Sequence, residues 1–377
     1  MISQIGINER RVIDLLRQRG AMSRASIARD MDLGAPTLTK ITQTLTSLGI
    51  LRELHKVRDG YPGKPAQLVA IHPDGAYSAG ISLQSEYLSV CVVDLSGGVK
   101  GTITRPLDYP EPKFIGELSA QLLRQLLTEC QIPADRFLGA GICMPGLALS
   151  ALGSGLPSEP PHLLPDEFHA WKNIELEPFF STLLGVPVWF ENSAKAATLA
   201  DAYFGAGQSL RHFASIHIAF GLGGGLILNR QLYRGAFGRA GEFGGAFPYE
   251  GTRASGRDLL LFLKEHMENP PTHIRELYER KIPANLIQQW VDRVVDGLAD
   301  MSATLMAALD LEAIIFNGLL PTEILSVLAQ AMRIRLPRLI FSGFGMPEIL
   351  VSKLAQSGLE IGAASLPIHF VLSANAS

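Results

Sequence analysis

Four polar side chains at the start of a helical segment are of types that could read DNA base edges. They are Thr37, Thr39, Lys40 and Gln43. Small hydroxyls, an amide and an ammonium group suit the amino end of a helix in the major groove, where donors and acceptors identify each base pair. Lys64 lies in a turn-rich segment and could run along phosphates or enter the minor groove. These residue types predict contact with double-stranded DNA.

The elements that must position these residues follow from local patterns. Helical periodicity covers residues 8–19, Ser23 is a good N-cap for a second helix, and a third begins at residues 35–36 with a proline in its first turn. The buried stripe of this third helix is Leu38, Ile41, Leu45 and Leu48. Strands are expected at 51–56 and 67–71, around the turn-rich residues 57–65. The pattern indicates a winged helix-turn-helix, a fold that binds DNA but also mediates protein contacts.

Charge is divided unevenly along the 377 residues. Residues 1–72 hold 11 Lys and Arg against 6 Asp and Glu, whereas the remainder holds 22 against 30, within a net charge of -3. A basic head on an acidic body favours a polyanionic partner for the head, although a chance surface bias is also compatible with it. No apolar run approaches the length of a membrane span, and the three cysteines stand apart in apolar surroundings. We therefore expect a cytoplasmic protein without disulfides or membrane insertion.

The acidic body has the pattern of an α/β protein. Residues 73–75 form a natural hinge after the wing, and an alternating segment, 79–94, leads through a turn to a strand at 100–107. An amphipathic helix at 117–130 precedes a buried strand at 139–144. Further strands are expected at 186–191, 215–220 and 313–317. Strands and helices that alternate in this way predict an α/β fold.

Four body segments carry a family resemblance. They are residues 80–94, Met144-Pro145-Gly146, residues 188–192 with the alanine-rich helix that follows, and residues 221–244. The body resembles the ROK family of sugar kinases and sugar-responsive repressors, which implies a bilobal actin-like ATPase fold. The implied domains are a winged helix-turn-helix at 1–72, a first lobe at 73–190 and a second lobe at 191–377, whose last helix returns to the first lobe.

The head is similar to that of the repressor branch. Residues 23–29 read Ser-Arg-Ala-Ser-Ile-Ala-Arg, and residues 63–65 read Gly-Lys-Pro where the family usually has Gly-Arg-Pro. The resemblance adds Arg24 and Gly63 to the expected DNA-binding residues, beside Lys64.

Departures from the kinases bear on catalysis. Where family kinases hold ATP phosphates with an Asp-x-Gly-Gly-Thr loop, residues 82–86 read Ser-Leu-Gln-Ser-Glu, and Ser193 replaces the aspartate that acts as general base. A serine is no base near neutral pH, and a loop without glycine does not let the backbone approach phosphate closely. The family's zinc-binding cysteines are also absent, since no cysteine follows Cys143. We expect no catalysis, no metal and no cofactor.

The resemblance retains part of a sugar site. Asn192 and Glu242 match positions that hydrogen-bond sugar hydroxyls, and Gly146 lies in the loop that packs over the sugar ring. As an alternative, Asn192 only caps the helix at 193–202, and Glu242 only pairs with Arg239 or Arg253. The glycines at 221–225 are a weak signal for phosphate.

Three functional hypotheses follow. The first is a repressor, a homodimer or higher homo-oligomer, that binds a double-stranded DNA operator and responds to a sugar effector. The second is a sugar kinase with an attached DNA-binding domain, which Ser82 and Ser193 oppose. The third is a repressor controlled by a protein partner.

Overall fold

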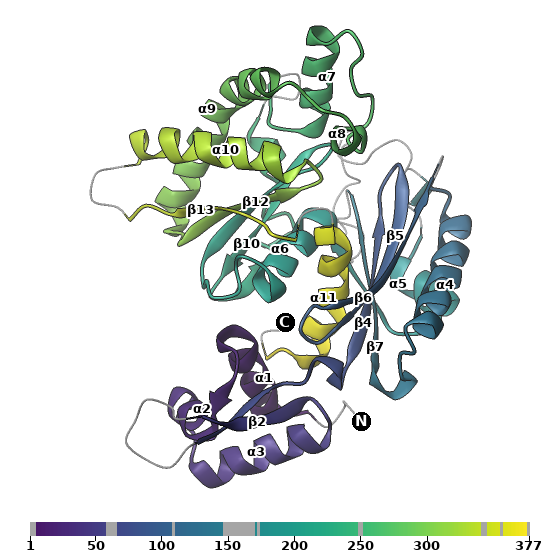
Figure 1. The fold of residues 1–377 in the computed structure, drawn as a ribbon, viewed down its shortest axis with the longest axis vertical. Helices are drawn as coiled ribbons and strands as arrows, with labels where there is room; N and C mark the ends of the chain where they lie inside the picture. Colours follow the sequence, from purple (N-terminus) through teal and green to yellow (C-terminus); the bar gives the residue numbers. More distant parts are fainter. Residues whose placement is uncertain are drawn as a thin grey trace. The chain divides into compact units, whose positions relative to one another are not determined.

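A computed structural model describes residues 5–57, 66–107, 110–145, 170–171, 174–247, 252–340, 345–354 and 357–374. Residue contacts divide the chain into two compact units, with breaks between Glu191 and Asn192 and between Gly362 and Ala363. The first unit holds the N-terminal head, an α/β lobe and the C-terminal residues; the second holds another α/β lobe (Figure 1). Both lobes are α/β, as the sequence predicts.

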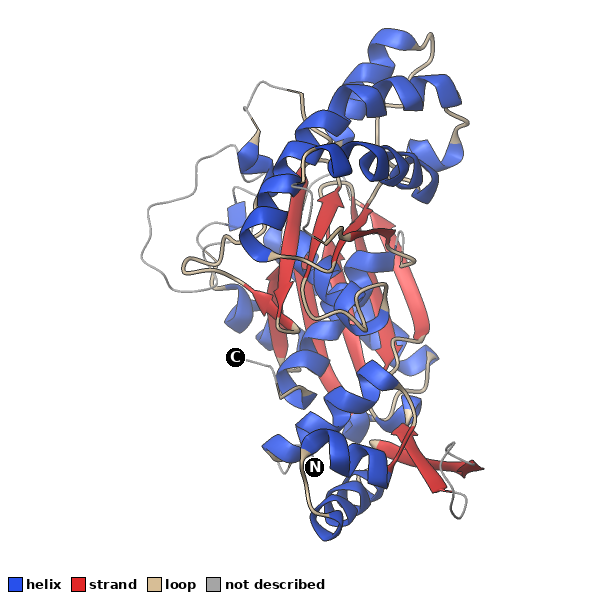
Figure 2. Cartoon of the chain, turned by 90° about the vertical axis from the view of Figure 1, so that its left-hand side faces the viewer, coloured by secondary structure: helices blue, strands red, loops and turns tan. Residues whose placement is uncertain are grey.

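The head is a winged helix-turn-helix. Its elements are α1 (Ile7–Arg19), β1 (Met22–Ser23), α2 (Arg24–Met31), α3 (Ala35–Ser47), β2 (Leu51–Val57) and β3 (Ala66–Ile71). Ser23 caps α2 as expected, because its side chain accepts a hydrogen bond from the Ser26 amide. The short strand β1 was not predicted from the sequence. It pairs with β3 in a three-stranded sheet of order β1-β3-β2. Strands β2 and β3 form a ribbon that projects beyond the head's helices (Figure 2).

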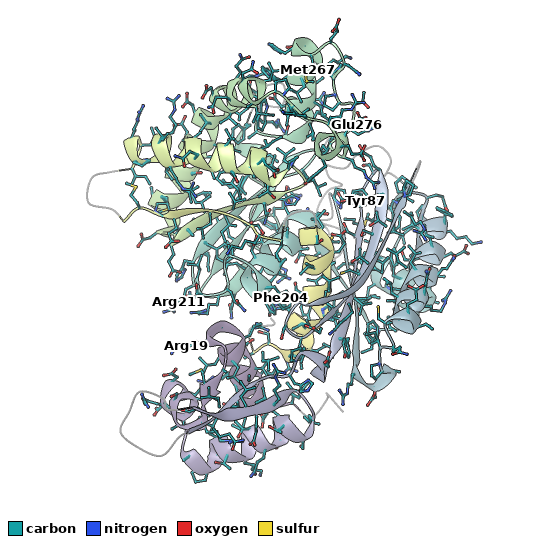
Figure 3. The ribbon with its side chains drawn as sticks, in the orientation of Figure 1. Arg19, Tyr87, Phe204, Arg211, Met267 and Glu276 are labelled. Atoms are coloured by element: carbon teal, nitrogen blue, oxygen red, sulfur yellow. The ribbon has the colours of Figure 1, made fainter. Side chains whose placement is uncertain are left out.

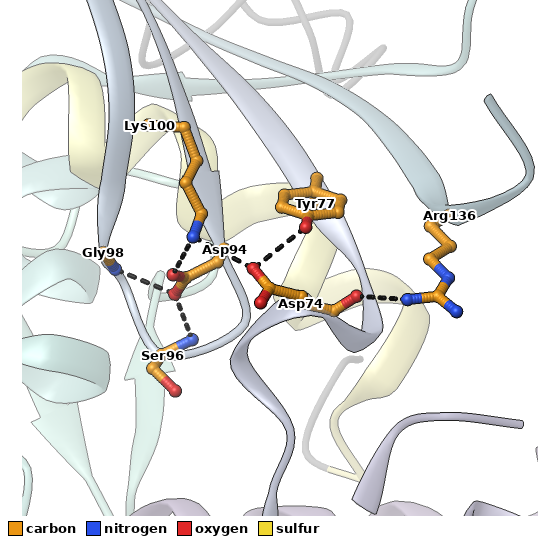
Figure 4. A network of polar contacts seen from close by, with 7 residues as sticks. All are labelled: Asp74, Tyr77, Asp94, Ser96, Gly98, Lys100 and Arg136. Carbon is orange, nitrogen blue, oxygen red and sulfur yellow. Dashed lines mark hydrogen bonds and ion pairs between the residues drawn. The ribbon is translucent and has the colours of Figure 1, made fainter. Parts of the chain in front are cut away.

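The connection between head and lobe, where the sequence predicts a hinge, is a short 3-10 turn, η2 (Pro73–Gly75). The Asp74 carboxylate accepts hydrogen bonds from Tyr77 Oη and Lys100 Nζ, both at 2.9 Å, and Arg136 donates to the Asp74 carbonyl at 2.9 Å (Figure 4). Lys100 also pairs with Asp94 at 3.1 Å, and its hydrogen bonds to the two carboxylates raise its pKa to about 12. These contacts hold the turn to the lobe.

The lobe of the first unit has a five-stranded sheet of order β6-β5-β4-β7-β8. Its elements are β4 (Tyr77–Leu83), β5 (Tyr87–Asp94), β6 (Val99–Pro106), α4 (Pro112–Glu129), η3 (Ala134–Arg136), β7 (Phe137–Met144), α5 (Leu176–Leu184) and β8 (Val188–Asn192). The segment expected as one alternating strand at 79–94 is instead the antiparallel pair β4 and β5. Almost every residue of both strands is buried, so polarity does not alternate along them. Helix α4 begins five residues earlier than expected, because the Glu111 side chain caps it.

The second lobe repeats the topology of the first. Its elements are α6 (Ser193–Phe204), β9 (Phe213–Ile218), β10 (Leu222–Leu228), β11 (Gln231–Tyr233), η6 (Phe243–Ala246), α7 (Gly256–His266), α8 (Glu276–Glu279), α9 (Ala284–Leu309), β12 (Ala313–Gly318), α10 (Thr322–Arg335), η7 (Leu336–Arg338) and β13 (Glu348–Val351). The strand order β11-β10-β9-β12-β13 places the third, second, first, fourth and fifth strands side by side, as in the first lobe. This internal duplication is not visible in the sequence pattern.

The C-terminal helix α11 (Gly358–Leu372) begins in the second unit and continues in the first. Within the first unit, the Ser78 hydroxyl donates to the Ala364 carbonyl at 2.7 Å. Beyond the helix, the Ser373 hydroxyl and the Ala374 amide donate to Asp14 Oδ2 at 2.9 and 2.8 Å. Asp14 belongs to α1, so the two residues that follow α11 are hydrogen-bonded to the first helix of the head.

Candidate functional site

Helix α3 has the two faces that the sequence predicts. Thr37, Thr39, Lys40 and Gln43 are exposed. The opposite face buries Leu38, Ile41 and Leu45 against the head's core. Leu48, expected in the same stripe, instead lies just beyond the end of the helix and is only half-buried. The outward face is therefore short, polar and close to the amino end of the helix, which is the geometry that reads a major groove.

The hydroxyl of Thr39 is partly engaged within the helix. It donates to the Ala35 carbonyl at 2.8 Å, so its oxygen can only accept from a base while that bond is kept. Lys40, whose side chain is exposed one residue further on, carries the positive charge of this face. Gly63 and Lys64, the expected wing residues, lie outside the described residues.

Arg24, the remaining expected DNA-binding residue, makes contacts inside the head. Its Nε donates to Thr42 Oγ1 at 2.9 Å, and its Nη2 pairs with Glu53 Oε1 at 2.6 Å. Thr42 belongs to α3 and Glu53 to β2. The sequence shows the arginine but not its partners, which lie 18 and 29 residues away.

Asn192 stands at the end of β8, where it caps α6. Its Oδ1 accepts from the amides of Ala194 and Lys195 at 2.9 and 3.4 Å. The capping role weighed in the sequence analysis is thus present. Capping fixes the amide plane at the amino end of α6.

Glu242 lies just before η6, and the residue as a whole is exposed. Partial burial of its carboxyl raises the pKa, while the positive charges of Lys195 and Arg239 act in the opposite direction. Lys195 is almost completely buried and donates to the Gly238 carbonyl. The second unit therefore brings Asn192, Lys195 and Glu242 into one region. The sequence analysis missed Lys195; a lysine in the first turn of an alanine-rich helix was the available signal. Gly146 lies outside the described residues.

The segment that holds phosphate in family kinases is a tight turn here. Strand pairing continues to Leu83 opposite Leu88, and the Gln84 amide donates to the Tyr87 carbonyl at 2.9 Å. The Gln84 side chain donates to Ser82 Oγ at 3.3 Å. Tyr87, at the start of β5, is labelled in Figure 3. A turn closed by its own backbone and side-chain bonds does not present a row of amides to phosphate.

The glycines of β10 have a packing role. A Cβ on Gly224 would lie 2.2 Å from the Ser215 carbonyl oxygen, and one on Gly225 would lie 2.4 Å from Thr198 Oγ1 of α6. Glycine is therefore required for the close approach of β9 and α6. This accounts for part of the glycine-rich segment without a phosphate.

A buried polar network lies between α6 and the sheet of the second lobe. Asn317 of β12 donates to Asp201 Oδ2 at 2.8 Å and to Ser215 Oγ at 2.7 Å, while Ser352 Oγ donates to Asp201 Oδ1 at 2.7 Å. Because both Asn317 amide protons are used, its oxygen must accept, so His217 Nδ1, at 2.8 Å, carries a proton. His217 is thus a buried residue of the core.

Burial shifts both titratable members of this network toward their neutral forms. Desolvation raises the pKa of Asp201 to about 6, although the hydrogen bonds from Asn317 and Ser352 oppose the shift. Desolvation lowers the pKa of His217 to about 4, against the opposing effect of its bond to Asn317. The neutral histidine keeps a buried Nε2 without a hydrogen-bond partner among the described residues.

Neither a metal cluster nor a spanning helix is found in the described part of the chain. No group of three or more His, Cys, Asp or Glu side chains there could hold a metal ion. No helix of the described residues is long and apolar enough to cross a bilayer.

The fold and these sites define a class of protein: a winged helix-turn-helix joined to a bilobal, actin-like body of the sugar-kinase type. The sequence profile described as the ROK family matches residues 78–369. The chain belongs to the ROK family.

Three similar proteins represent both branches of the family. The xylose repressor of Bacillus spizizenii is 25% identical over 238 residues, which cover 63% of this chain and 59% of the repressor. A β-glucoside kinase of Listeria monocytogenes is 31% identical over 177 residues, which cover 45% of this chain and 59% of the kinase. The crystal structure of a ROK family transcriptional regulator, a homologue of the E. coli MLC protein, has a TM-score of 0.72 at 21% identity, covering 98% of this chain and 97% of that one.

Proposed function

We propose that this protein is a transcription regulator, acting as a repressor, whose head binds an operator and whose body binds a sugar or sugar derivative. One observation carries the proposal: an exposed polar face on α3 belongs to a winged head that precedes a ROK body. The likeness to the xylose repressor supports the same assignment. Thr37, Thr39, Lys40 and Gln43 would meet the major groove. Gly63 and Lys64 would meet the backbone or minor groove.

The body is proposed to act without catalysis. Ser193 stands where the kinases have their general base. Residues 82–86 form a turn closed by its own hydrogen bonds, in place of a phosphate-binding loop. The likeness to β-glucoside kinase keeps phosphoryl transfer as the alternative function. An assay with ATP and a panel of hexoses and glucosides separates the two. Turnover of a few per second, in the ordinary kinase range, would overturn the proposal.

Operator specificity would require two heads. One head offers a small interface, and repressors of this type read half-sites spaced by whole helical turns. We therefore propose a homodimer held by the body, acting in the cytoplasm, where its DNA lies. Sedimentation at micromolar concentration, with and without DNA, tests this. A monomer that binds its operator tightly would contradict the dimer.

The effector would contact Asn192 and Glu242 in the second unit. A polyol needs donors and acceptors that remain paired when buried. Thermal shift with a sugar panel tests binding, since a ligand of the folded state stabilises it by RT ln(1 + [L]/Kd). Specific DNA binding without any shift from the panel would favour a repressor controlled by a protein partner.

DNA binding itself is tested by selection. The full chain is incubated with a random double-stranded pool, and bound sequences are enriched and sequenced. Recovery of a motif with paired half-sites supports the proposal. Enrichment of no motif, with affinity equal for all sequences, would refute sequence-specific regulation.

A further inference from the structure

The guanidinium of Arg24 joins α3 to the wing, the ribbon of β2 and β3. Its Nε donates to Thr42 Oγ1 on α3 at 2.9 Å, and its Nη2 pairs with Glu53 Oε1 on β2 at 2.6 Å. Glu53 is itself held from the other wing strand, because Gln67 Nε2 of β3 donates to its Oε2 at 2.7 Å. One arginine at the start of α2 thus contacts α3 directly and reaches both wing strands through a single carboxylate.

The contact on α3 lies beside the residues proposed to read bases. Thr42 is fully buried, and its hydroxyl lies 3.0 Å from the Leu38 carbonyl and 3.1 Å from the Thr39 carbonyl, to which it can donate while it accepts from Arg24. Arg24 is therefore anchored to the turn of α3 that carries Thr39. Movement of the guanidinium would break a bond to a buried hydroxyl.

The contact on the wing lies where the pairing register of the ribbon shifts. Glu53 is opposite Val69, and the register of β2 and β3 shifts between Glu53 and Lys56. Such an irregularity bends a strand and increases its local twist, so a bond at its base affects where the rest of the ribbon points.

We propose that Arg24 is a positioning residue, which orients the wing relative to α3 through Glu53, and that it does not bind a DNA phosphate. This rests on the proposed DNA-binding function. A DNA phosphate would have to compete for Arg24 with the Glu53 carboxylate, which is already paired with it at 2.6 Å. Binding of the phosphate would leave Glu53 near the DNA without its pairing partner Arg24. The side chain of Arg24 is 28% exposed, against 42% for that of Glu53, so the carboxylate is the more accessible member of the pair.

Glu53→Gln provides the decisive test, because the two roles predict opposite signs. If Arg24 contacts phosphate, removal of a negative charge that competes for it strengthens DNA binding. If Arg24 positions the wing, the same change releases the ribbon and weakens binding by about ten-fold, the equivalent of one charged hydrogen bond. The full chain is used, with a double-stranded sequence selected by the wild-type protein.

Two matched variants complete the design. Asp32→Asn also removes a negative charge from the head. Asp32 is exposed, and its backbone φ of 53° is one that asparagine adopts readily. This control variant should leave the DNA affinity unchanged or slightly raised. Arg24→Gln should weaken binding like Glu53→Gln while the slope of log K against log salt stays the same. The double variant should bind no more weakly than either single variant, since both break one link.

The outcomes separate the possibilities. Tighter binding by Glu53→Gln, or loss of about one unit of salt slope in Arg24→Gln, would overturn the positioning role. If Arg24→Gln does not fold by circular dichroism, Glu53→Gln and Asp32→Asn still decide the question. Failure of the wild-type protein to select any DNA would refute the proposed function itself, which is a different result from any change among the variants.

Discussion

The buried pair Asp201 and His217 makes opposite contributions to the pH dependence of stability. Burial raises the Asp201 pKa from 3.8 to about 6 and lowers the His217 pKa from 6.5 to about 4. At about 1.4 kcal/mol per pKa unit, each shift corresponds to about 3 kcal/mol over its full range. The two ranges overlap between about pH 4 and pH 6.

The signs follow from where protons bind. In that range His217 is protonated in the unfolded chain and neutral in the folded protein, so this group makes the free energy of unfolding rise with pH. Its contribution to stability is complete above pH 6.5 and is lost as pH falls toward 4. In the same range Asp201 is protonated in the folded protein and ionised in the unfolded chain. This group therefore makes the free energy of unfolding fall as pH rises from about 3.8 to about 6. One proton is bound by each state, and the wild-type protein should show almost no net dependence from the pair.

Single substitutions should expose each slope. Asp201→Asn leaves the histidine alone, so its stability, relative to wild type, should rise by about 1.4 kcal/mol per pH unit between pH 4 and 6. His217→Gln should show the opposite slope. The absolute stability of either variant at one pH is not the test, because both lose hydrogen bonds to Asn317.

The measurement can be confined to the second unit. The chain has three tryptophans, and Trp290 is completely buried in the second unit, whereas Trp171 and Trp189 belong to the first. Replacing Trp171 and Trp189 with phenylalanine leaves Trp290 fluorescence as the reporter of urea unfolding. Parallel pH profiles for wild type, Asp201→Asn and His217→Gln would refute the assignment of these protonation states.

Three further outcomes are expected. Lys40→Ala should weaken DNA binding and reduce the salt slope by about one unit, whereas Lys113→Ala, an exposed lysine on α4, should change neither; equal effects would place the DNA elsewhere. Asn192→Ala should lower unfolding free energy by about 1 kcal/mol in urea titrations through loss of the α6 cap, and an unchanged value would mean that capping adds nothing. Asp14→Ala should increase hydrogen exchange at the Ala374 amide, because its acceptor is removed; unchanged protection would show that this contact does not form in solution.

The sequence by itself determined the head and the identity of the residues at the positions that the kinases use for catalysis. Helix periodicity, the Ser23 cap and the proline at the start of α3 are local signals, and the structure has these helices within one or two residues of their expected bounds. Ser193 and the residues at 82–86 are identities that need no structure to be compared with the kinase pattern. The exposure of Thr37, Thr39, Lys40 and Gln43 also followed from periodicity, because the buried positions of a helix fix the exposed ones.

Tertiary structure decided which polar groups meet. Asn317 contacts His217 from 100 residues away and Asp201 from 116, and no local pattern links them. Arg24 had the residue type of a phosphate contact, and only its neighbours Thr42 and Glu53 show what its hydrogen bonds do. The split between β4 and β5 was hidden for a related reason: the segment was interpreted as one alternating strand, and only the pairing of its two halves shows the turn at Gln84. Periodicity reports which face of an element is buried, but the partner of a buried or paired charge is set by the packing of elements distant in the chain.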